Sequence, residues 1–487
     1  MFSLSFVVYG NSPLKNSNCC THAMACFASA VLILHKLMDA LDKRHFPRPA
    51  PPGSGSGSGS GPSSGSGSIC LLWDESHLWA ILLWRCLAAW GVPLRLARAS
   101  EIAAGLLRDQ PPAALFVPGG WARFKAEALG PDGRKAVGDY LRSGGVYVGL
   151  CGGAGLALPD NHGLAVCPLC RKPMAQRLPN FSGSVACAPQ QGHPLVPQDA
   201  PALIDLPVWW PSQFAIPKDA ATGGIDVLAA YVRPGPDFWV SDLALEQVAA
   251  PERSAWERLY GINLDPELLR GEPCIVTGPV GTGQYILSYA HLETPGSPAA
   301  NSWLGHMLSF LTGQPPRLFE NREAPAWNLA ETPVVWDDPH LARIAGHLEA
   351  IIALGMRHFL LFWRHPWLLG WRRGIPGFVL TTLYAQVQTI RSLPPHAETE
   401  ALWARHADDL ETLALEFRRK MEAYLIAERL VMQRTPSSPE GSACDQVQKQ
   451  RRELIGRFPG YGGLFGRIVR QLDELVWRQA ATATPIP

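Results

Sequence analysis

Short apolar runs that alternate with helical segments are the sequence feature that most constrains the fold of this chain. The runs ICLLW, PLRL, ALFV and VYVGL lie between residues 69 and 150, and each has the length of a strand. Helical segments follow the first three runs, at 76–90, 100–107 and 132–142. Such an alternation predicts a parallel, doubly wound α/β sheet that is buried on both faces. Ser76 is expected to cap the first helix and Gly91 to end it.

Composition divides the rest of the chain into segments. Residues 47–68 are Pro-rich and then Gly/Ser-rich, so we expect a flexible linker that buries no apolar area. It separates a leader, residues 1–46, from an α/β domain predicted over 69–315. The leader's apolar run is short for a membrane span and lacks signal-peptide flanks, so we expect an amphipathic helix or a non-native extension. Helical periodicity predicts an all-α region over 330–487.

Three further segments belong to this plan. Residues 161–271 are rich in Pro, Trp and Gly, and we expect a loop-rich insertion that covers the carboxyl edge of the sheet. Strands return at 274–277 and 284–289, before a helix near 298–311. The intervening GPVGTGQ lacks the Lys-Ser/Thr ending of a phosphate loop, and a hairpin turn is expected there. The run FLLFWRHPWLLGW at 359–371 is interrupted by Arg, His and Pro, which favours a buried or interfacial helix over a membrane span.

Charge and cysteine content limit the partners and the compartment. The chain has 43 basic and 42 acidic residues and therefore lacks the excess positive charge with which proteins bind nucleic acids. We expect no nucleic-acid partner. Eleven cysteines without regular spacing argue against a disulfide-stapled secreted scaffold. We therefore expect a cytoplasmic protein that does not associate with membranes.

Cys151 follows the fourth apolar run directly, within GLCGG. A nucleophile at a strand-to-helix turn needs small neighbours, because the turn is tight and strains the backbone. The following helix N-terminus favours the negative charge of a thiolate. A buried cysteine in a Gly-rich turn is the alternative interpretation of the same pattern.

His291 and Glu293 come directly after the strand at 284–289. Residues i and i+2 of an extended segment point to the same side, so Glu293 can orient His291 while the second ring nitrogen faces Cys151. This arrangement predicts a Cys-His-Glu triad, against the alternative of a capping histidine beside a surface glutamate. Gly120, in the PGG turn after the third run, and Gly152 are candidates for the two N–H donors of an oxyanion hole.

The three motifs strand-PGG, strand-GxCxG and strand-HxE, in this order, resemble the class I glutamine amidotransferase-like superfamily. The segments VPGGWARFKAEAL, YLRSGGVYVGLCGGAGLAL and GQYILSYAHLETP resemble most its biotin-protein ligase N-terminal-domain branch. The resemblance covers about residues 69–312 and implies a flavodoxin-like sheet. It also implies hydrolysis or transfer at a carboxamide carbon through a thioester, with Cys151 as nucleophile, His291 as base and Glu293 as its orienting group.

The chain departs from the superfamily at several positions. Glutaminases carry a Gln soon after the elbow, whereas Ala154, Gly155 and Leu156 follow it here, so glutamine is not implied as the substrate. The basic loop of biotin ligases and the synthetase loop that accepts ammonia are both missing from the sequence, so neither activity is implied. In another branch of the superfamily, the acidic residue that accompanies the cysteine lies near the first strand. Asp74 and Glu75 lie there, although that interpretation leaves the His-x-Glu pair unexplained.

Two hypotheses follow. The leading one is a cysteine-dependent amidotransferase- or amidohydrolase-like enzyme that acts on a small carboxamide or acyl substrate without a cofactor, with Trp209 and Trp210 walling the substrate cleft. The alternative is a catalytically silent binding or scaffold module that recruits a protein partner through residues 330–487. Half of a zinc-ligand spacing is present in Cys167 and Cys170, with Cys187 and His193 downstream. A structural zinc site needs a second close pair, so no metal site is expected.

Overall fold

Five parallel strands form the core sheet in this computed structural model, which describes residues 66–160, 162–217, 224–371, 376–434, 443–457 and 460–483. They are β1 (Ser66–Leu72), β2 (Leu94–Ala97), β3 (Pro112–Val117), β4 (Val146–Leu150) and β13 (Gly283–Ser288). Their order across the sheet is β2-β1-β3-β4-β13. This is the strand order of a flavodoxin-like doubly wound sheet, so the predicted α/β fold class is confirmed.

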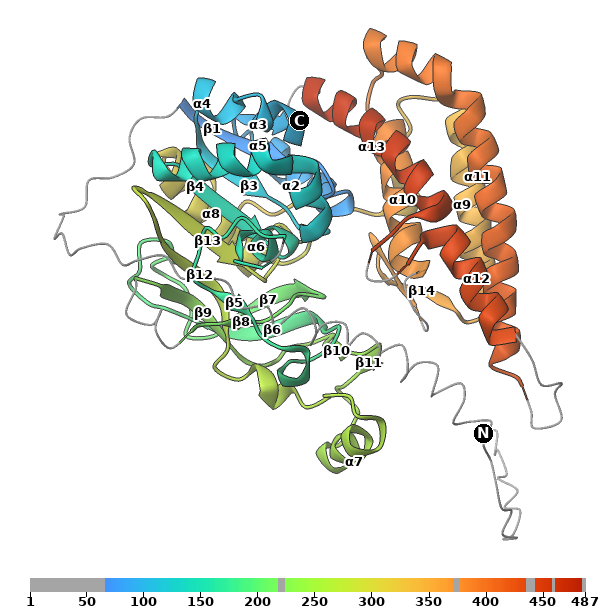
Figure 1. Ribbon diagram of the computed structural model, residues 1–487, viewed down its shortest axis with the longest axis horizontal. Helices are drawn as coiled ribbons and strands as arrows, with labels where there is room; N and C mark the ends of the chain where they lie inside the picture. The colour runs from blue at the N-terminus through green and yellow to red at the C-terminus, as the bar shows by residue number, and fades with distance from the viewer. Residues whose placement is uncertain are drawn as a thin grey trace. The chain divides into compact units, whose positions relative to one another are not determined.

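Helices cover both faces of this sheet (Figure 1). Cys70 and Leu72 of β1 belong to the core cluster under the helices α3 (Ala99–Ala103), α4 (Leu106–Asp109), α5 (Ala122–Arg142) and α6 (Gly152–Ala157). The alternate residues of β1 therefore point to the opposite face, where α2 (Leu78–Ala89) and α8 (Pro298–Thr312) pack.

Two predicted helix starts are wrong. The helix α5 begins at Ala122 instead of 132, and Gly130 (φ 57°) with Pro131 kinks it without ending it. Ser76 does not cap α2, because His77 is the residue that precedes the helix. The Ser76 hydroxyl instead donates to the carbonyl of Leu72 at 3.3 Å.

The segment predicted as a loop-rich insertion, 161–271, adds strands to the same sheet. Four antiparallel strands extend it past β13, namely β12 (Pro273–Val280), β9 (Asp226–Pro234), β6 (Ser182–Pro189) and β7 (Ile204–Trp209). Of these, β9, β6 and β7 come from that segment and lie beyond β12, which matches the strand predicted at 274–277. The short strands β10 (Trp239–Val240) and β11 (Leu243–Ala244) finish that edge, β5 (Cys170–Arg171) pairs with β8 (Phe214–Ala215), and α7 (Ala250–Tyr260) follows. The strands β12 and β13 form a hairpin that pairs Val280 with Gly283, which confirms the predicted turn.

The C-terminal region is helical, as predicted, except for one hairpin. Its helices are α9 (Pro339–Arg357), α10 (Pro376–Ser392), α11 (Ala397–Val431), α12 (Ala443–Ile455) and α13 (Gly463–Thr482). Asp338 caps α9 by accepting hydrogen bonds from the backbone N–H groups of His340 and Leu341, both at 2.9 Å. The helix predicted over 359–371 is wrong, because β14 (Leu361–His365) and β15 (Leu368–Trp371) form an antiparallel hairpin there. Short 3-10 turns lie at Met174–Gln176, Pro266–Leu269, Pro316–Leu318 and Leu329–Glu331.

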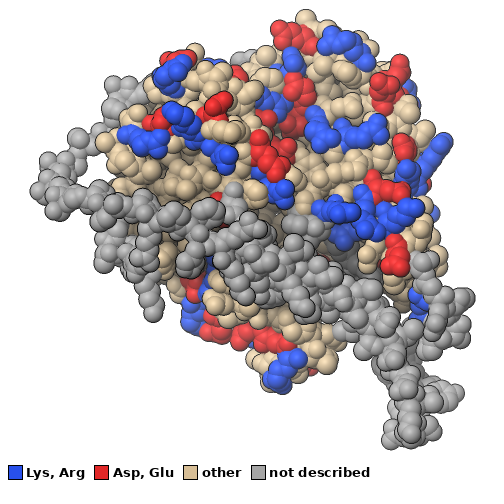
Figure 2. Space-filling model, in the orientation of Figure 1, with Lys and Arg blue, Asp and Glu red and all other residues tan. Residues whose placement is uncertain are grey.

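The chain forms two compact units. Among the described residues, one unit comprises 66–422 and 452–483 and carries the sheet, the hairpin and α13, and the other comprises 423–451. The predicted leader, 1–46, and all but the end of the predicted linker, 47–68, lie outside the described residues. Within the described ranges, no helix combines the length and the apolar character needed to cross a bilayer. Basic and acidic side chains are interspersed on the face drawn in Figure 2.

Candidate active site

Cys151 sits at the turn between β4 and α6 in a backbone conformation that side chains rarely adopt, with φ 47° and ψ −101°. Its N–H donates to the carbonyl of Ser288 at 2.7 Å, which anchors the turn to the end of β13. The next residues must be small, since a Cβ on Gly153 would lie 1.9 Å from the carbonyl oxygen of Val117. The thiol therefore stands at the carboxyl end of the parallel strands, where open α/β sheets bind their ligands.

The PGG turn after β3 lies directly against this cysteine turn. Gly120 has φ 111°, and a Cβ on Gly152 would lie 2.0 Å from the Gly120 carbonyl oxygen. Neither Gly120 nor Gly152 donates a backbone hydrogen bond to another residue in the described part of the chain. Two N–H groups are thus available beside the cysteine, as an oxyanion hole requires.

His291 and Glu293 are both completely buried, with 0% exposure. The Nδ1 atom of His291 lies 2.8 Å from Oε1 of Glu293. Their loop is held by Asn301 of α8, whose side-chain amide donates to the carbonyls of Leu292 (2.8 Å) and Thr294 (3.1 Å). A buried carboxylate on one ring nitrogen selects the tautomer and stabilises the imidazolium.

Strand β7 brings the histidine and the cysteine together. The carbonyl of Pro207 accepts the His291 N–H at 2.8 Å, and the carbonyl of Trp209 lies 3.7 Å from the Cys151 sulfur. The backbone carbonyls of residues two apart in a strand point to the same edge, so His291 and Cys151 lie at the same edge of β7. The PGG turn closes this arrangement, since a Cβ on Gly119 would be 3.0 Å from Cε1 of His291.

The electrostatics of His291 favour its cationic form. Burial by itself would lower the pKa of His291, but the charges of Glu293 and of Cys151 outweigh it and raise that pKa to about 10. The Nε2 atom of His291 makes no hydrogen bond of ordinary geometry within the described residues, although hydrogen bonding to the Cys151 side chain contributes to the raised pKa of His291. One ring nitrogen is therefore committed to Glu293 and the other remains available for a substrate or for the sulfur.

Aromatic side chains surround the pair, and sequence reasoning identified only two of them. Trp209 contacts Cys151 through its backbone carbonyl, and Trp210 packs on Trp209 with ring centroids 6.1 Å apart. Trp79 of α2 packs on the His291 ring with centroids 4.4 Å apart. Phe378 of α10 stacks on Trp79 at 6.0 Å, and Trp371 of β15 packs on Trp210 at 5.1 Å. Their distance along the chain from every motif left no sequence signal for Trp371 or Phe378.

A buried lysine supports the turn that follows β1. Lys125 has 0% exposure, and its Nζ donates to the carbonyl of Asp74 at 3.0 Å and to the hydroxyl of Ser76. Burial lowers the pKa of Lys125 to about 7, against the attraction of Glu75 and Asp74. The same turn also contacts the segment that contains Gly120, a candidate donor of the oxyanion hole. The carbonyl of Glu75 accepts the N–H of Trp121, the residue after Gly120, at 3.3 Å.

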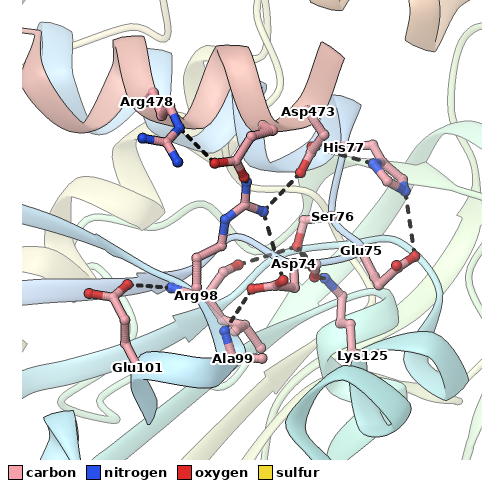
Figure 3. A network of polar contacts seen from close by, with 12 residues as sticks. Asp74, Glu75, Ser76, His77, Arg98, Ala99, Glu101, Lys125, Asp473 and Arg478 are labelled. Atoms are coloured by element: carbon pink, nitrogen blue, oxygen red, sulfur yellow. Dashed lines mark hydrogen bonds and ion pairs between the residues drawn. The ribbon is translucent and has the colours of Figure 1, made fainter. Parts of the chain in front are cut away.

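Helix α13 and the loop before it contact this turn through a network of charges (Figure 3). His77 forms ion pairs with Asp473 of α13 (Nδ1 to Oδ1, 3.4 Å) and with Glu75 (Nε2 to Oε2, 3.6 Å). Burial would lower the pKa of His77, but hydrogen bonds and attraction from Asp473 and Glu75 raise it to about 9. The hydroxyl of Tyr461 donates to Glu75 at 2.5 Å.

Both carboxylates near the first strand are engaged by groups other than Cys151. The Glu75 side chain is engaged by Tyr461 and His77. Asp74 accepts the N–H of Ala99 at 2.7 Å and lies 3.7 Å from Arg98. Within the described residues, the carboxylate in contact with His291 is that of Glu293, at 2.8 Å.

The half zinc spacing does not assemble. Cys167 is buried and its thiol lies 3.6 Å from the carbonyl of Ala157, whereas Cys170 is exposed. Cys187 lies on β6 beside Cys274, with sulfurs 3.8 Å apart. Among the residues that the structure describes, no group of three His, Cys, Asp or Glu side chains has the arrangement of a metal site.

Comparisons with known proteins give structural neighbours of low identity. No family model matches the chain, and no curated protein sequence matches it. A putative GMP synthase component from Thermoplasma acidophilum has 14% identity and a TM-score of 0.31, over 50% of this chain and 94% of that one. A β-galactosidase from Bacillus circulans sp. alkalophilus has 12% identity and a TM-score of 0.31, over 52% of this chain and 32% of that one. A cold-adapted β-galactosidase from Rahnella sp. R3 has 12% identity and a TM-score of 0.28, over 51% and 31%.

Proposed function

We propose that the protein is a cysteine-dependent enzyme of the amidotransferase or amidohydrolase type, acting on a small carboxamide or acyl substrate. The observation that carries the proposal is the strained Cys151 turn at the same edge of β7 as a fully buried His291–Glu293 pair. A strained nucleophile and a buried charged pair each cost stability. Their meeting at the carboxyl end of a parallel sheet points to chemistry.

The proposed reaction uses five groups. The proton shared by Cys151 and His291 resides on Nε2 of His291, in line with the raised pKa of that histidine, and the sulfur attacks the carbonyl carbon of the substrate. The backbone N–H groups of Gly120 and Gly152 donate to the resulting oxyanion. The carbon–nitrogen bond then breaks as the leaving amine takes the proton from His291, which leaves a thioester on Cys151. Water, deprotonated by His291, hydrolyses the thioester and restores the thiol, while Glu293 stabilises the imidazolium throughout.

The proposal extends to family, partner and compartment. We assign the chain to the class I glutamine amidotransferase-like superfamily, and to its biotin-protein ligase N-terminal-domain branch, on the three motifs and the strand order. A cytoplasmic location and a protein partner for residues 330–487 remain predictions of the sequence.

Thiol labelling tests the nucleophile. Brief treatment with iodoacetamide, followed by peptide mass spectrometry, should modify Cys151 faster than Cys170, although Cys170 is exposed and Cys151 only partly so. His291→Ala should slow labelling of Cys151 at least tenfold and leave Cys170 unchanged, since Cys170 lies on β5, which pairs with β8 and not with the strand that precedes His291. Equal rates at the two thiols would refute the nucleophile.

Turnover tests the enzyme. Release of ammonia or amine from a panel of carboxamides should occur with the full chain and with Cys170→Ser, and should be lost in Cys151→Ser. If Cys151 is labelled no faster than Cys170, and no carboxamide in the panel releases ammonia or amine, the result would favour the silent binding module.

A further inference from the structure

The rings around the candidate nucleophile come from segments far apart in the sequence. Trp79 lies on α2, Trp209 and Trp210 at the end of β7, Trp371 on β15 and Phe378 on α10. Two of these elements, β15 and α10, belong to the C-terminal region, outside the strands and helices that carry the three motifs. Nothing in the proposed reaction requires an aromatic residue, so their convergence needs a separate explanation.

The contacts among these rings close around the reacting pair. Starting from His291, Trp79 packs on the imidazole at 4.4 Å and stacks on Phe378 at 6.0 Å. Phe378 meets Trp210 edge-to-face at 6.0 Å, and Trp210 meets Trp209 at 6.1 Å. The carbonyl of Trp209 then contacts the Cys151 sulfur at 3.7 Å. We call Trp79, Trp209, Trp210, Trp371 and Phe378 the aromatic ring.

Part of the aromatic ring remains accessible. Trp79 and Trp209 are buried, at 4% and 3% exposure, whereas Trp210, Trp371 and Phe378 are partly exposed, as is Cys151 itself. Aromatic side chains combine a large apolar face with a preference for stacking, so partly exposed ones can contact a ligand. The partly exposed rings of Trp210, Trp371 and Phe378 are therefore available to a flat ligand.

Trp210 also carries backbone strain. Its φ is 52°, a conformation that is an outlier for a bulky residue, and its N–H is held by the carbonyl of Phe181 at 2.9 Å. Strain of this kind persists only where the surroundings enforce it, and it concentrates at binding sites. The strain presents the Trp210 ring to Phe378 and Trp371.

The charges beside the aromatic ring are already paired. Arg364 of β14 lies over the Trp209 ring at 5.3 Å, but its guanidinium is held by Asp237 at 3.1 Å. Glu293 is committed to His291 at 2.8 Å. A free amino acid such as glutamine needs a partner for its ammonium group and another for its carboxylate. The five residues of the aromatic ring supply neither.

We propose that the substrate is a carboxamide or acyl compound that carries an uncharged aromatic or similarly flat apolar group next to the reacting carbonyl. That group stacks on Trp210 and Phe378 while the carbonyl faces Cys151. This inference rests on the proposed function, since it takes Cys151 as the reacting atom. It also gives the C-terminal region a role, because β15 and α10 supply Trp371 and Phe378 to the site.

A matched pair of electrophiles tests the substrate class without any turnover. Chloroacetamide and N-phenylchloroacetamide alkylate a thiol by the same displacement of chloride, and they differ only in the phenyl ring. At each cysteine, the rate with N-phenylchloroacetamide is divided by the rate with chloroacetamide. Dividing the value for Cys151 by the value for the exposed Cys170 of the same protein isolates the effect of the side chains around Cys151. We expect a preference of roughly tenfold or more for the phenyl reagent at Cys151.

Variants of the aromatic ring locate the origin of that preference. Trp210→Ala and Phe378→Ala should each reduce it several-fold, and Trp210→Phe, which keeps an aromatic face, should retain most of it. The control is Trp336→Ala, since Trp336 is another partly exposed tryptophan, but it packs on Trp403 at 6.1 Å and not on the aromatic ring. Circular dichroism of each variant checks that it folds.

The outcomes separate this inference from the proposed function. Equal ratios at Cys151 and Cys170, no reaction of Cys151 with either reagent, or a preference that survives both alanine variants would overturn the inference. A phenyl preference without hydrolysis of any amide would support binding of a flat group at the aromatic ring and would refute the proposed enzymatic function. Hydrolysis of small aliphatic or amino-acid amides without a phenyl preference would support the proposed enzymatic function and refute the inference of an aromatic substrate.

Discussion

Asp473→Asn should destabilise the protein by an amount that depends on pH. Asp473 lies on α13 and contacts two cations of the β1–α2 and β2–α3 turns, His77 at 3.4 Å and Arg98 at 3.0 Å. The asparagine keeps the shape of the side chain and removes its charge. The substitution therefore tests whether the charge network of Figure 3 attaches α13 to the turn beside the candidate oxyanion hole.

The size of the effect follows from His77. The pKa of His77 is raised from 6.5 to about 9, and each unit of pKa is worth about 1.4 kcal/mol. Protonated His77 thus contributes roughly 3 kcal/mol of stability. Because the folded pKa is the higher one, this contribution is fully present below about pH 6.5 and is lost as the pH rises through 9.

Asp473 shares this contribution with Glu75, so removing its charge forfeits about half of it. The weakened contact with Arg98 adds roughly 1 kcal/mol. We expect Asp473→Asn to lower the free energy of unfolding by roughly 2–3 kcal/mol at pH 6.5 and by roughly 1 kcal/mol at pH 9.5, where His77 is largely neutral.

Urea unfolding followed by tryptophan fluorescence at pH 6.5, 8 and 9.5 measures the effect. Glu474→Gln is the matched control, because Glu474 contacts the same Arg98 at 2.8 Å from the same helix, but is 36% exposed and does not pair with His77. It should cost less than about 1 kcal/mol, with no trend across this pH range. A penalty for Asp473→Asn that is equal at pH 6.5 and pH 9.5, or equal to that of Glu474→Gln, would refute the reasoning.

Two further predictions concern the site itself. In Glu293→Gln the pKa of His291 should fall by roughly 1–2 units, since a buried charge-assisted hydrogen bond at 2.8 Å is lost; NMR titration of the imidazole measures this, and an unchanged pKa would contradict the pairing. Gly152→Ala should destabilise the protein by roughly 1–3 kcal/mol in thermal unfolding, because its Cβ would lie 2.0 Å from the Gly120 carbonyl oxygen. Gly155→Ala, whose nearest neighbour is a movable Arg171 nitrogen at 3.2 Å, should be tolerated, and equal effects of the two alanines would argue against the close approach.

The motifs of the candidate site could be predicted because each one is local. The strand over 146–150 appears with its predicted bounds, and it runs directly into the cysteine turn. The pairing of His291 with Glu293 follows from their spacing of two residues. Short-range periodicity and the conformational freedom of glycine carry this information, and neither depends on the rest of the chain.

The hairpin over 361–371 could not be predicted in the same way. A short apolar run is compatible with a buried helix or a strand, and only its packing decides. Here Leu361 pairs with Trp371, Phe362 with Gly370, and a Cβ on Gly370 would lie 2.4 Å from the Phe362 ring. The same limit applies to residues 182–234, where β6, β7 and β9 find their partners in the main sheet.

The amino-acid sequence by itself determined the doubly wound sheet, the tight turn at Cys151 and the His-x-Glu pair, because strand and helix periods and glycine positions are local properties of the chain. Only the tertiary structure decided what surrounds them. Trp371 and Phe378 lie more than two hundred residues from Cys151 along the chain, and Asp473 lies farther still from His77. Long-range packing and burial brought these residues to the site, and they determine both the aromatic ring and the charge of His77.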